Sequence, residues 1–274
     1  MGGLRFDYHS IYGSQLNGRL GLVSSPLSSV HVKLLYGGSF KAPAPLLLYA
    51  VPMEPGDILG NAQLKPQRAD TFEGQIAWTA SPGLVMSTGV SYLLVQNMAA
   101  FQEQGLNEVA VNIAKMTSLT WETRLDASYK WILGYGSFEL VRARRDTGMV
   151  GYVGELLGTR APIYPWAQVH LGVAILPASL PVRIGLQGTW VASRNASDSN
   201  ALDAGGVYSL PSYVQLDGNI ALTRIRLFGD DRRTGTLSLV ARNILDTQVA
   251  DPGFAGVDYP RPPRTIILSY AQEL

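Results

Sequence analysis

The sequence of 274 residues contains no cysteine, which excludes disulfides, thiolate metal sites and cysteine nucleophiles. It also lacks an apolar run of the roughly 18 residues that a membrane-spanning helix needs. At the N-terminus no basic stretch precedes an apolar one, so we expect no signal peptide. A formal net charge of +1 provides little attraction for polyanions, and we predict no nucleic-acid partner.

Histidine is equally scarce, with His9, His31 and His170 as the three in the chain. Each lies on a different segment without a neighbouring ligand, so their spacing does not fit a metal site. A Ser-His-acid hydrolase would show a nucleophile elbow, which the sequence lacks, and phosphate-binding and dinucleotide-binding glycine motifs are missing as well. We therefore predict hydrogen-bonding roles for the histidines, and no enzyme, catalytic residue, cofactor or metal site.

What the sequence does contain is an alternation of apolar and polar residues with a period of two, from end to end. Five long polar loops, at 41–68, 98–107, 145–164, 194–211 and 246–263, alternate with short turns such as "SPG" and "PAS". The pattern predicts about twelve β-strands. They are expected at residues 3–12, 17–24, 29–40, 69–79, 84–97, 108–128, 131–144, 165–176, 180–193, 212–227, 235–245 and 264–273.

Two folds accommodate such strands. A soluble β-sandwich buries the apolar face between two sheets, whereas a membrane barrel turns it towards lipid. Several of the expected strands are longer than ten residues, and about nine to eleven are needed to cross a bilayer. Short turns on one rim and long loops on the other are typical of outer-membrane barrels. We therefore predict an all-β fold, an antiparallel transmembrane β-barrel meander whose strands follow the chain order.

The two faces of the strands differ in polarity, which predicts their orientation. Apolar residues expected to face lipid are Val182, Ile184, Leu186, Leu216, Ile220 and Leu268. Polar residues expected on the inner face include Arg183, Gln187, Asp217 and Glu122. Aromatic residues near strand ends fit interfacial girdles, and these are Tyr36, Trp78, Tyr92, Trp131, Trp166, Trp190, Tyr213 and Tyr270.

The stretches "WETRLD" (121–126) and "LRFDYH" (4–9) place opposite charges at alternate positions. Because side chains at i and i+2 share a face of a strand, Glu122, Arg124 and Asp126 line one side. An acid/base pair for catalysis is one interpretation, but a row of ion pairs on the inner face explains the spacing better. We therefore predict ion pairs along these strands.

Three stretches, in the family's order, resemble the C-terminal part of TonB-dependent outer-membrane receptors. They are "YGGSFKAPAP" (36–45), "GNAQLKPQRADTFEGQ" (60–75), and "NILDTQVADPG" (243–253) followed by "PPRTIILSY" (262–270). The stretch "TWE" (120–122) stands where the family often has Gly-Val-Glu. The chain departs from the family pattern at Lys41, Ala62, Gln67, Val249 and Pro263.

The resemblance implies that residues 1–274 are the C-terminal part of the barrel of such a receptor, which closes about 22 strands around a plug. The plug domain and the signal peptide are then expected to be absent. It also implies location in the outer membrane of a Gram-negative bacterium, in contact with lipid and lipopolysaccharide. The TonB–ExbB–ExbD system would act through the missing plug region. The ligand would be a small molecule or metal chelate, such as a ferric siderophore or cobalamin.

Two alternatives remain from the sequence. A self-contained outer-membrane pore or barrel enzyme of twelve strands is one, since about twelve is an even and permitted strand number. A soluble adhesive or binding β-domain is the other. The DNA upstream of the Met1 codon separates the first from a receptor, and solubility without detergent would favour the second.

Ligand recognition is expected in the long loops, chiefly 41–68 and 145–164. A cationic and aromatic set at one strand end has the chemistry to hold an anionic chelate. It consists of Arg142, Arg144, Arg145, Arg160, Tyr152 and Tyr164. Contact with lipopolysaccharide or solvent is the alternative role of this set. Since the plug would complete any site, the sequence assigns no binding residue.

Overall fold

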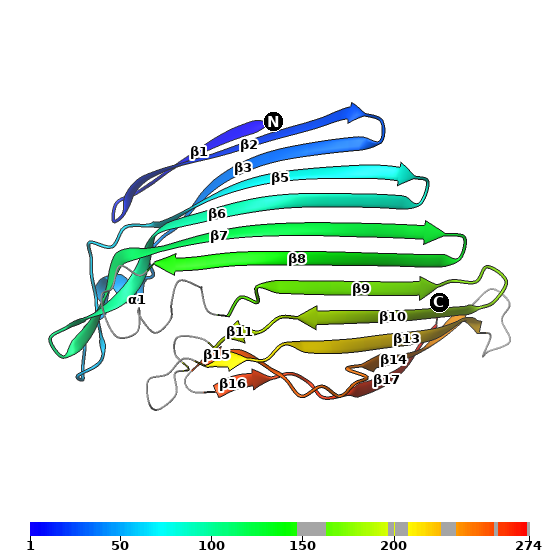
Figure 1. Ribbon diagram of the computed structural model, residues 1–274. Helices are drawn as coiled ribbons and strands as arrows, with labels where there is room; N and C mark the ends of the chain where they lie inside the picture. The colour runs from blue at the N-terminus through cyan, green and yellow to red at the C-terminus, as the bar shows by residue number, and fades with distance from the viewer. Residues whose placement is uncertain (147–162, 197–199, 201–207, 226–233, 255–256, 273–274) are drawn as a thin grey trace. The chain divides into compact units, whose positions relative to one another are not determined.

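The computed structural model describes residues 1–146, 163–196, 200, 208–225, 234–254 and 257–272. Almost all of the regular structure is β-strand (Figure 1). In the described residues, twelve strands of the main sheet are hydrogen-bonded in chain order. They are β1 (Gly2–His9), β2 (Gly13–Leu27), β3 (Val30–Lys41), β5 (Gln67–Ser81), β6 (Leu84–Gln104), β7 (Asn107–Tyr129), β8 (Ile132–Asp146), β9 (Ala167–Ile175), β10 (Val182–Val191), β13 (Tyr213–Ile225), β14 (Gly235–Arg242) and β17 (Thr265–Gln272).

Six short elements lie between the long strands. They are α1 (Pro45–Tyr49), β4 (Ile58–Leu59), β11 (Arg194–Asn195), β12 (Ser209–Leu210), β15 (Ala250–Phe254) and β16 (Val257–Pro260). Strands β11 and β12 form one small antiparallel hairpin, and β15 and β16 form another. Strand β4 adds to the main sheet by pairing in parallel with the start of β7.

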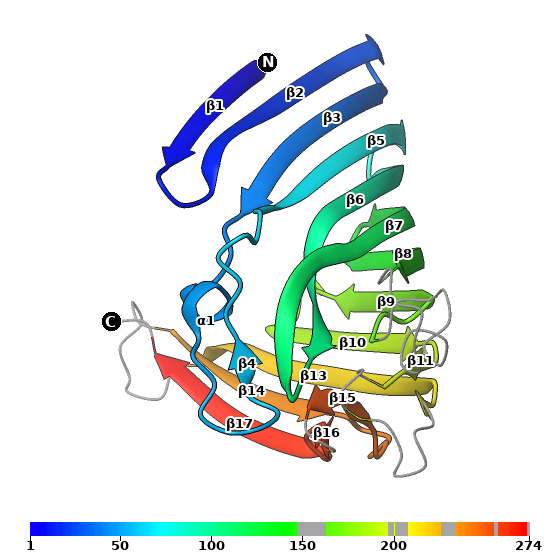
Figure 2. The same cartoon turned by 90° about the vertical axis from the view of Figure 1, so that its left-hand side faces the viewer.

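The first of two compact units comprises residues 1–76, 89–121 and the described part of 141–161. In it, β1, β2 and β3 pair antiparallel with their neighbours. A small apolar cluster, Leu48, Leu64 and Ala110, is buried where α1 and the chain around β4 lie against β7 (Figure 2). Leu48 belongs to α1, whose first residue is Pro45. A proline is tolerated at this position because the backbone N–H there has no partner within the helix.

The motif around Gly60 explains how this loop is held. Asn61 donates its side-chain amide to the Ala110 carbonyl at 2.9 Å, and its backbone N–H to the Leu47 carbonyl at 2.8 Å. A Cβ at Gly60 would lie 2.6 Å from the backbone nitrogen of Ala50, so a side chain does not fit there. The Gly-Asn pair noted in the sequence therefore fastens the segment between β3 and β5 onto β7.

The second unit comprises residues 77–88, 122–140 and the described part of 162–274. Strands β8, β9, β10, β13, β14 and β17 pair antiparallel in that order. The β5–β6 turn, Pro82–Gly83, has Gly83 at φ +88°, the left-handed region that glycine enters without a steric penalty. The second unit therefore contains a continuous run of registered strands that positions the polar side chains described below.

The expected meander of about twelve strands in chain order is confirmed, and most boundaries agree within a few residues. The loop expected at 98–107 is wrong, because β6 continues to Gln104 and β7 begins at Asn107. The turn between them needs Gly105, at φ +67°, instead of a long polar stretch. The expected start of the second strand at residue 17 is also wrong, since β2 begins at Gly13, and the helix α1 was not predicted.

Candidate functional site

The polar residues of the second unit gather on one face because the strand register aligns them. Four residues on β8, β9, β10 and β13 form a cross-strand row, each paired with the next. They are Tyr135, Gly172, Gln187 and Asp217. Arg124 of β7 belongs to the same face, since its guanidinium carbon lies 4.9 Å from the centre of the Tyr135 ring. The predicted inner-face set therefore shares one face in the described strands.

The opposite face carries a continuous apolar row. It consists of Ile132, Ile175, Ile184, Ile220, Leu239 and Leu268, each paired with the next across β8 to β17. Ile220 is 47% exposed and Leu268 is 68% exposed. Leu186, on the same face, is also exposed, which contradicts a β-sandwich core at this position. The predicted separation of apolar from polar residues is confirmed, and contact of the apolar row with lipid stays a prediction.

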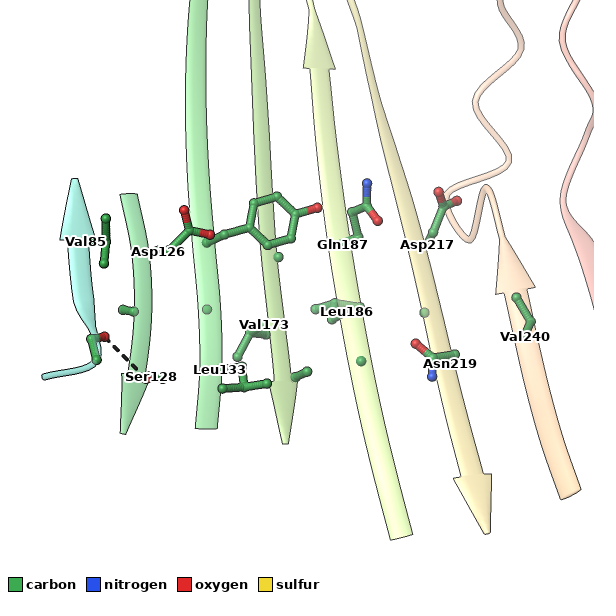
Figure 3. Close-up of a pocket in the computed structure, with 18 of the residues that line it drawn as sticks. Val85, Asp126, Ser128, Leu133, Val173, Leu186, Gln187, Asp217, Asn219 and Val240 are labelled. Atoms are coloured by element: carbon green, nitrogen blue, oxygen red, sulfur yellow. Dashed lines mark hydrogen bonds between the residues drawn. The ribbon is translucent and has the colours of Figure 1, made fainter. Parts of the chain in front are cut away.

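A cavity of about 710 Å³ lies along the polar row. Figure 3 shows Asp126, Gln187 and Asp217 at one level of its lining, with Asn219 one step along β13. Gly172 leaves room for the Tyr135 ring in this lining, because a side chain at residue 172 would collide with that ring. The ring instead lies across the glycine, an arrangement that covers exposed backbone with aromatic surface.

Ion pairs follow the strands as the alternating charges predict. Arg124 donates two hydrogen bonds to Asp126, at 2.7 and 2.6 Å, two residues along β7. Arg5 and Asp7 form the same arrangement on β1, with the shorter bond at 2.7 Å. The prediction of ion pairs within these two stretches is therefore confirmed. Such pairs neutralise carboxylates that would otherwise repel an anionic ligand.

A second cavity, of about 500 Å³, lies further along the same face. Its lining includes uncharged polar residues from three strands, namely Gln168, His170, Gln187, Thr189 and Gln215. His170 shares a hydrogen bond of 3.1 Å with Thr189, in agreement with the expected hydrogen-bonding role. Its charged lining residues are Arg194, Arg261 and Asp251. The cavity is therefore polar and carries a formal charge of +1 on its wall.

Asp251 joins the two arginines. Its carboxylate accepts a hydrogen bond of 2.5 Å from Arg194 and one of 2.9 Å from Arg261. Both guanidinium groups also lie against the ring of Tyr213, with their carbons 5.7 Å and 5.1 Å from its centre. A ring face attracts cations, so Tyr213 holds both arginines close together. This arrangement, which we call the Arg–Asp–Arg cluster, consists of Arg194, Asp251, Arg261 and Tyr213.

The chain reaches Asp251 through the "NILD" motif. Asn243 is buried after β14 and donates its side-chain amide to the Thr247 and Pro262 carbonyls, at 3.1 and 3.3 Å. It also accepts a hydrogen bond from the Thr247 backbone at 2.9 Å. Asn243 has φ +48°, a conformation that asparagine tolerates better than most residues. The motif therefore ends β14 and directs the chain into β15, where Asp251 lies.

A second carboxylate ties the two small hairpins together. Asp258 of β16 accepts hydrogen bonds from Tyr208 at 2.7 Å and from Asn200 at 3.1 Å, both in the β11–β12 region. Burial raises the pKa of Asp258, but hydrogen bonds from Tyr208, the Gly253 backbone and Asn200 outweigh it, so the net pKa lies below the usual range. The bond to Asp258, with desolvation, raises the pKa of Tyr208. The β15–β16 and β11–β12 hairpins are therefore connected by Asp258 and Asp251.

The cationic and aromatic set expected at the loop end is placed only in part. Arg142 and Arg144 lie exposed on β8, in the first unit, and Tyr164 is exposed in the second unit. Tyr152 and Arg160 lie outside the described residues, as does the side chain of Arg145. The expectation of recognition in loops 41–68 and 145–164 stays a prediction.

Sequence reasoning missed the Arg–Asp–Arg cluster. Tyr213 was expected in an interfacial girdle, which is wrong, because its side chain is 5% exposed between two arginines. The sequence contained part of the information that places Tyr213. It lies two and four residues before Gln215 and Asp217, so the three side chains share the polar face of one strand. Arg194, in the two-residue strand β11, and Arg261 both lie in stretches that were expected as long loops, where the period of two gives no orientation.

Among the described residues, no group of three or more histidine and acidic side chains is arranged to hold a metal ion. The helical part of the described chain contains no segment long and apolar enough to cross a membrane.

Comparison with known proteins gives a consistent result. The model of the TonB-dependent receptor-like β-barrel family matches residues 1–244. A ferric enterobactin receptor mutant from Pseudomonas aeruginosa matches with a TM-score of 0.73 and 17% identity, over 99% of this chain and 41% of that one. The FrpB iron transporter from Neisseria meningitidis, as apoprotein, matches with a TM-score of 0.73 and 14% identity, over 99% and 43%.

The ferric-catecholate import receptor Fiu from E. coli matches with a TM-score of 0.70 and 17% identity, over 95% of this chain and 35% of that one. At these identities the likeness concerns the fold. The chain spans less than half of the length of each of these solved structures. No curated protein matches the sequence.

Proposed function

This chain belongs to the TonB-dependent receptor-like β-barrel family, and we propose that it forms part of the wall of an outer-membrane uptake receptor in a Gram-negative bacterium. Residues 1–274 supply the C-terminal part of the barrel, and further strands with a plug complete it. The ligand is a scarce small molecule or metal chelate, with ferric siderophores as the leading class. The similar structures include a ferric enterobactin receptor and a ferric-catecholate import receptor, which supports that class.

The observation that carries the proposal is the contrast between the two faces of β8 to β17. One face has the apolar row from Ile132 to Leu268, most of which is exposed, whereas the other has Gln187 and Asp217 beside two cavities. Water would penalise such a continuous apolar surface, and soluble proteins rarely expose one. Lipid is itself apolar and does not penalise such a surface. The backbone of a barrel also tolerates lipid, because its polar groups are paired between strands.

The proposal assigns partners to each face. Outer-membrane lipid and lipopolysaccharide contact the apolar row and the ends of the strands. The ligand passes along the polar face, where the cavities lie. Energy reaches the receptor from the TonB–ExbB–ExbD system through the plug, a part of the intact receptor that lies beyond this stretch of barrel wall.

The proposal is tested by uptake measurements in the native host. The coding gene is deleted, and uptake of radiolabelled ferric siderophores of several chemical classes, and of cobalamin, is measured under iron limitation. A strain without TonB gives the signature of energised transport. We expect one ligand to lose uptake in both strains, and the protein to be recovered with outer membranes.

Two results would contradict the proposal. One is recovery of the protein in the aqueous fraction without detergent, which would favour a soluble β-domain. The other is unchanged uptake across the whole panel in the deletion strain. Complementation with the wild-type gene controls for effects on neighbouring genes.

A further inference from the structure

The Arg–Asp–Arg cluster is built like an anion site whose anion is supplied by the chain itself. Two guanidinium groups converge on one carboxylate, Asp251, and each is a fork of N–H donors suited to a carboxylate or phosphate. Asp251 comes from β15, a short strand in a loop, whereas Tyr213 and Gln215 belong to the long strand β13. The carboxylate is therefore on a more easily moved element than the floor of the site.

Donors remain available at this place. Within the part of the chain that the structure describes, Arg194 Nε and Tyr213 Oη are buried without a hydrogen-bond partner. The Arg194 side chain is 6% exposed, so these donors are shielded from bulk water. A buried donor without a partner is unfavourable, and a ligand oxygen that accepted its hydrogen bond would remove that penalty. Both residues line the cavity of about 500 Å³.

The charges around the cluster favour an anion. Among the lining residues, two arginines face a single carboxylate, and the remaining polar lining is amide, hydroxyl and imidazole. Asp258 also acts on Arg194 electrostatically, but it is not part of the lining and its oxygens are occupied by Tyr208, Asn200 and the Gly253 backbone. The cavity wall thus keeps one positive charge in excess.

We propose that Arg194 and Arg261 form a binding site for an oxyanion group, a carboxylate or phosphate, and that Asp251 is an internal counter-ion which the ligand displaces. The inference goes beyond the proposed uptake function, because it requires only the described cavity and concerns binding rather than transport. Displacement of Asp251 separates β15 from Arg194, and so couples anion binding to movement of the β15–β16 hairpin. In Figure 1, β11, β15 and β16 lie together beyond the ends of β10 and β13.

The proposal makes opposite predictions for two substitutions in one cluster. Asp251→Asn removes the competing charge and keeps the shape, so affinity for an oxyanion should rise about tenfold. Arg261→Gln removes one guanidinium from a half-exposed position, so affinity should fall about tenfold. Tyr213→Phe removes the unpaired hydroxyl and keeps the ring, and should weaken binding by a smaller factor.

Matched controls lie a few residues away. Arg264 pairs with Asp246 at 3.7 Å, and neither residue lines the cavity. Arg264→Gln and Asp246→Asn therefore change the net charge by the same amounts as the two test substitutions. Both should leave oxyanion affinity within about twofold of the wild type, because exposed charges act weakly at a distance in salt.

The experiment is equilibrium dialysis of the full-length protein in non-ionic detergent at low ionic strength, with radiolabelled inorganic phosphate, acetate and citrate as separate probes. Saturable binding of phosphate or acetate assigns the site to free small anions. Saturation by citrate alone assigns it to the acidic group of a larger polyanion. Each variant is first shown to be folded by its tryptophan fluorescence and by its heat-modifiable mobility in gels.

Three results would overturn the proposal: no saturable binding of any probe, binding that Arg261→Gln leaves unchanged, or weaker binding in Asp251→Asn. The last would mean that Asp251 organises the arginines instead of competing for them. Uptake measurements test the proposed transport function independently of these binding results. A receptor that transports its ligand normally in the Arg261→Gln variant would leave the uptake function intact and limit the site to binding.

Discussion

Replacement of Ile220 by arginine tests which face of the strands meets lipid. Ile220 lies seven residues from Tyr213 and five from Ile225, the ends of β13. At a rise of about 3.3 Å per residue and a strand tilt of about 40°, these separations correspond to about 18 Å and about 13 Å along the membrane normal. The side chain is therefore near the middle of an apolar band about 25 Å tall.

The expected cost follows from this depth. An arginine on the lipid face of a barrel costs about 2–4 kcal/mol at the midplane and about 0–1 kcal/mol near the interfaces. Ile220→Arg should therefore lower the folding equilibrium constant by a factor of roughly 30 to 700. Ile220 pairs with Ile184 and Leu239 and has no carboxylate opposite it in the row, so the new charge gains no partner there.

The matched control is Asn219→Arg. Asn219 is the preceding residue on β13, faces the polar side and lines the cavity that also contains Asp217. We expect a cost below about 1 kcal/mol, because the new guanidinium reaches water and a carboxylate two residues away on the same face.

The assay is urea unfolding of the full-length protein in lipid vesicles, followed by tryptophan fluorescence. Equal losses of stability in the two variants, or an unchanged midpoint in Ile220→Arg, would refute the assignment of the apolar row to lipid. A larger loss in Asn219→Arg would reverse the faces.

Two further predictions concern the interior of the second unit. Gly172→Val should cost about 1–3 kcal/mol by overpacking against Tyr135, and the cost should shrink in a Tyr135→Ala background; an equal urea-midpoint shift in both backgrounds would exclude the clash as its cause. Because the folded-state pKa of Asp258 is lowered, its contribution to stability is present above the unfolded-state pKa of about 3.9 and is lost as pH falls through the folded-state value. The rate of pepsin cleavage in the β15–β16 hairpin, divided by the rate in Asp258→Asn at the same pH, should therefore rise towards one as pH falls from about 5 to about 2, and a ratio that does not change with pH would exclude this role of Asp258.

The sequence alone determined the strands and their two faces, because the period of two is a local property of the backbone. Ile184 and Gln187 take their sides from the pleat, whichever strands lie next to them. The ordered motifs, from "YGGSFKAPAP" to "NILD", likewise indicated the family and the order of the strands from the sequence alone. The boundary between β6 and β7 was one exception, since Gly105 permits a tight turn where a long polar loop was expected.

The Arg–Asp–Arg cluster was decided by tertiary structure. Arg194 and Asp251 are 57 residues apart, and both lie outside the long strands, where no periodicity fixes the direction of a side chain. Their meeting depends on how two short hairpins pack beside Tyr213, an outcome set by long-range ion pairs and hydrogen bonds. A charged loop residue has the same local sequence signal whether it faces solvent or a buried partner, so burial and pairing emerge only when distant segments fold together.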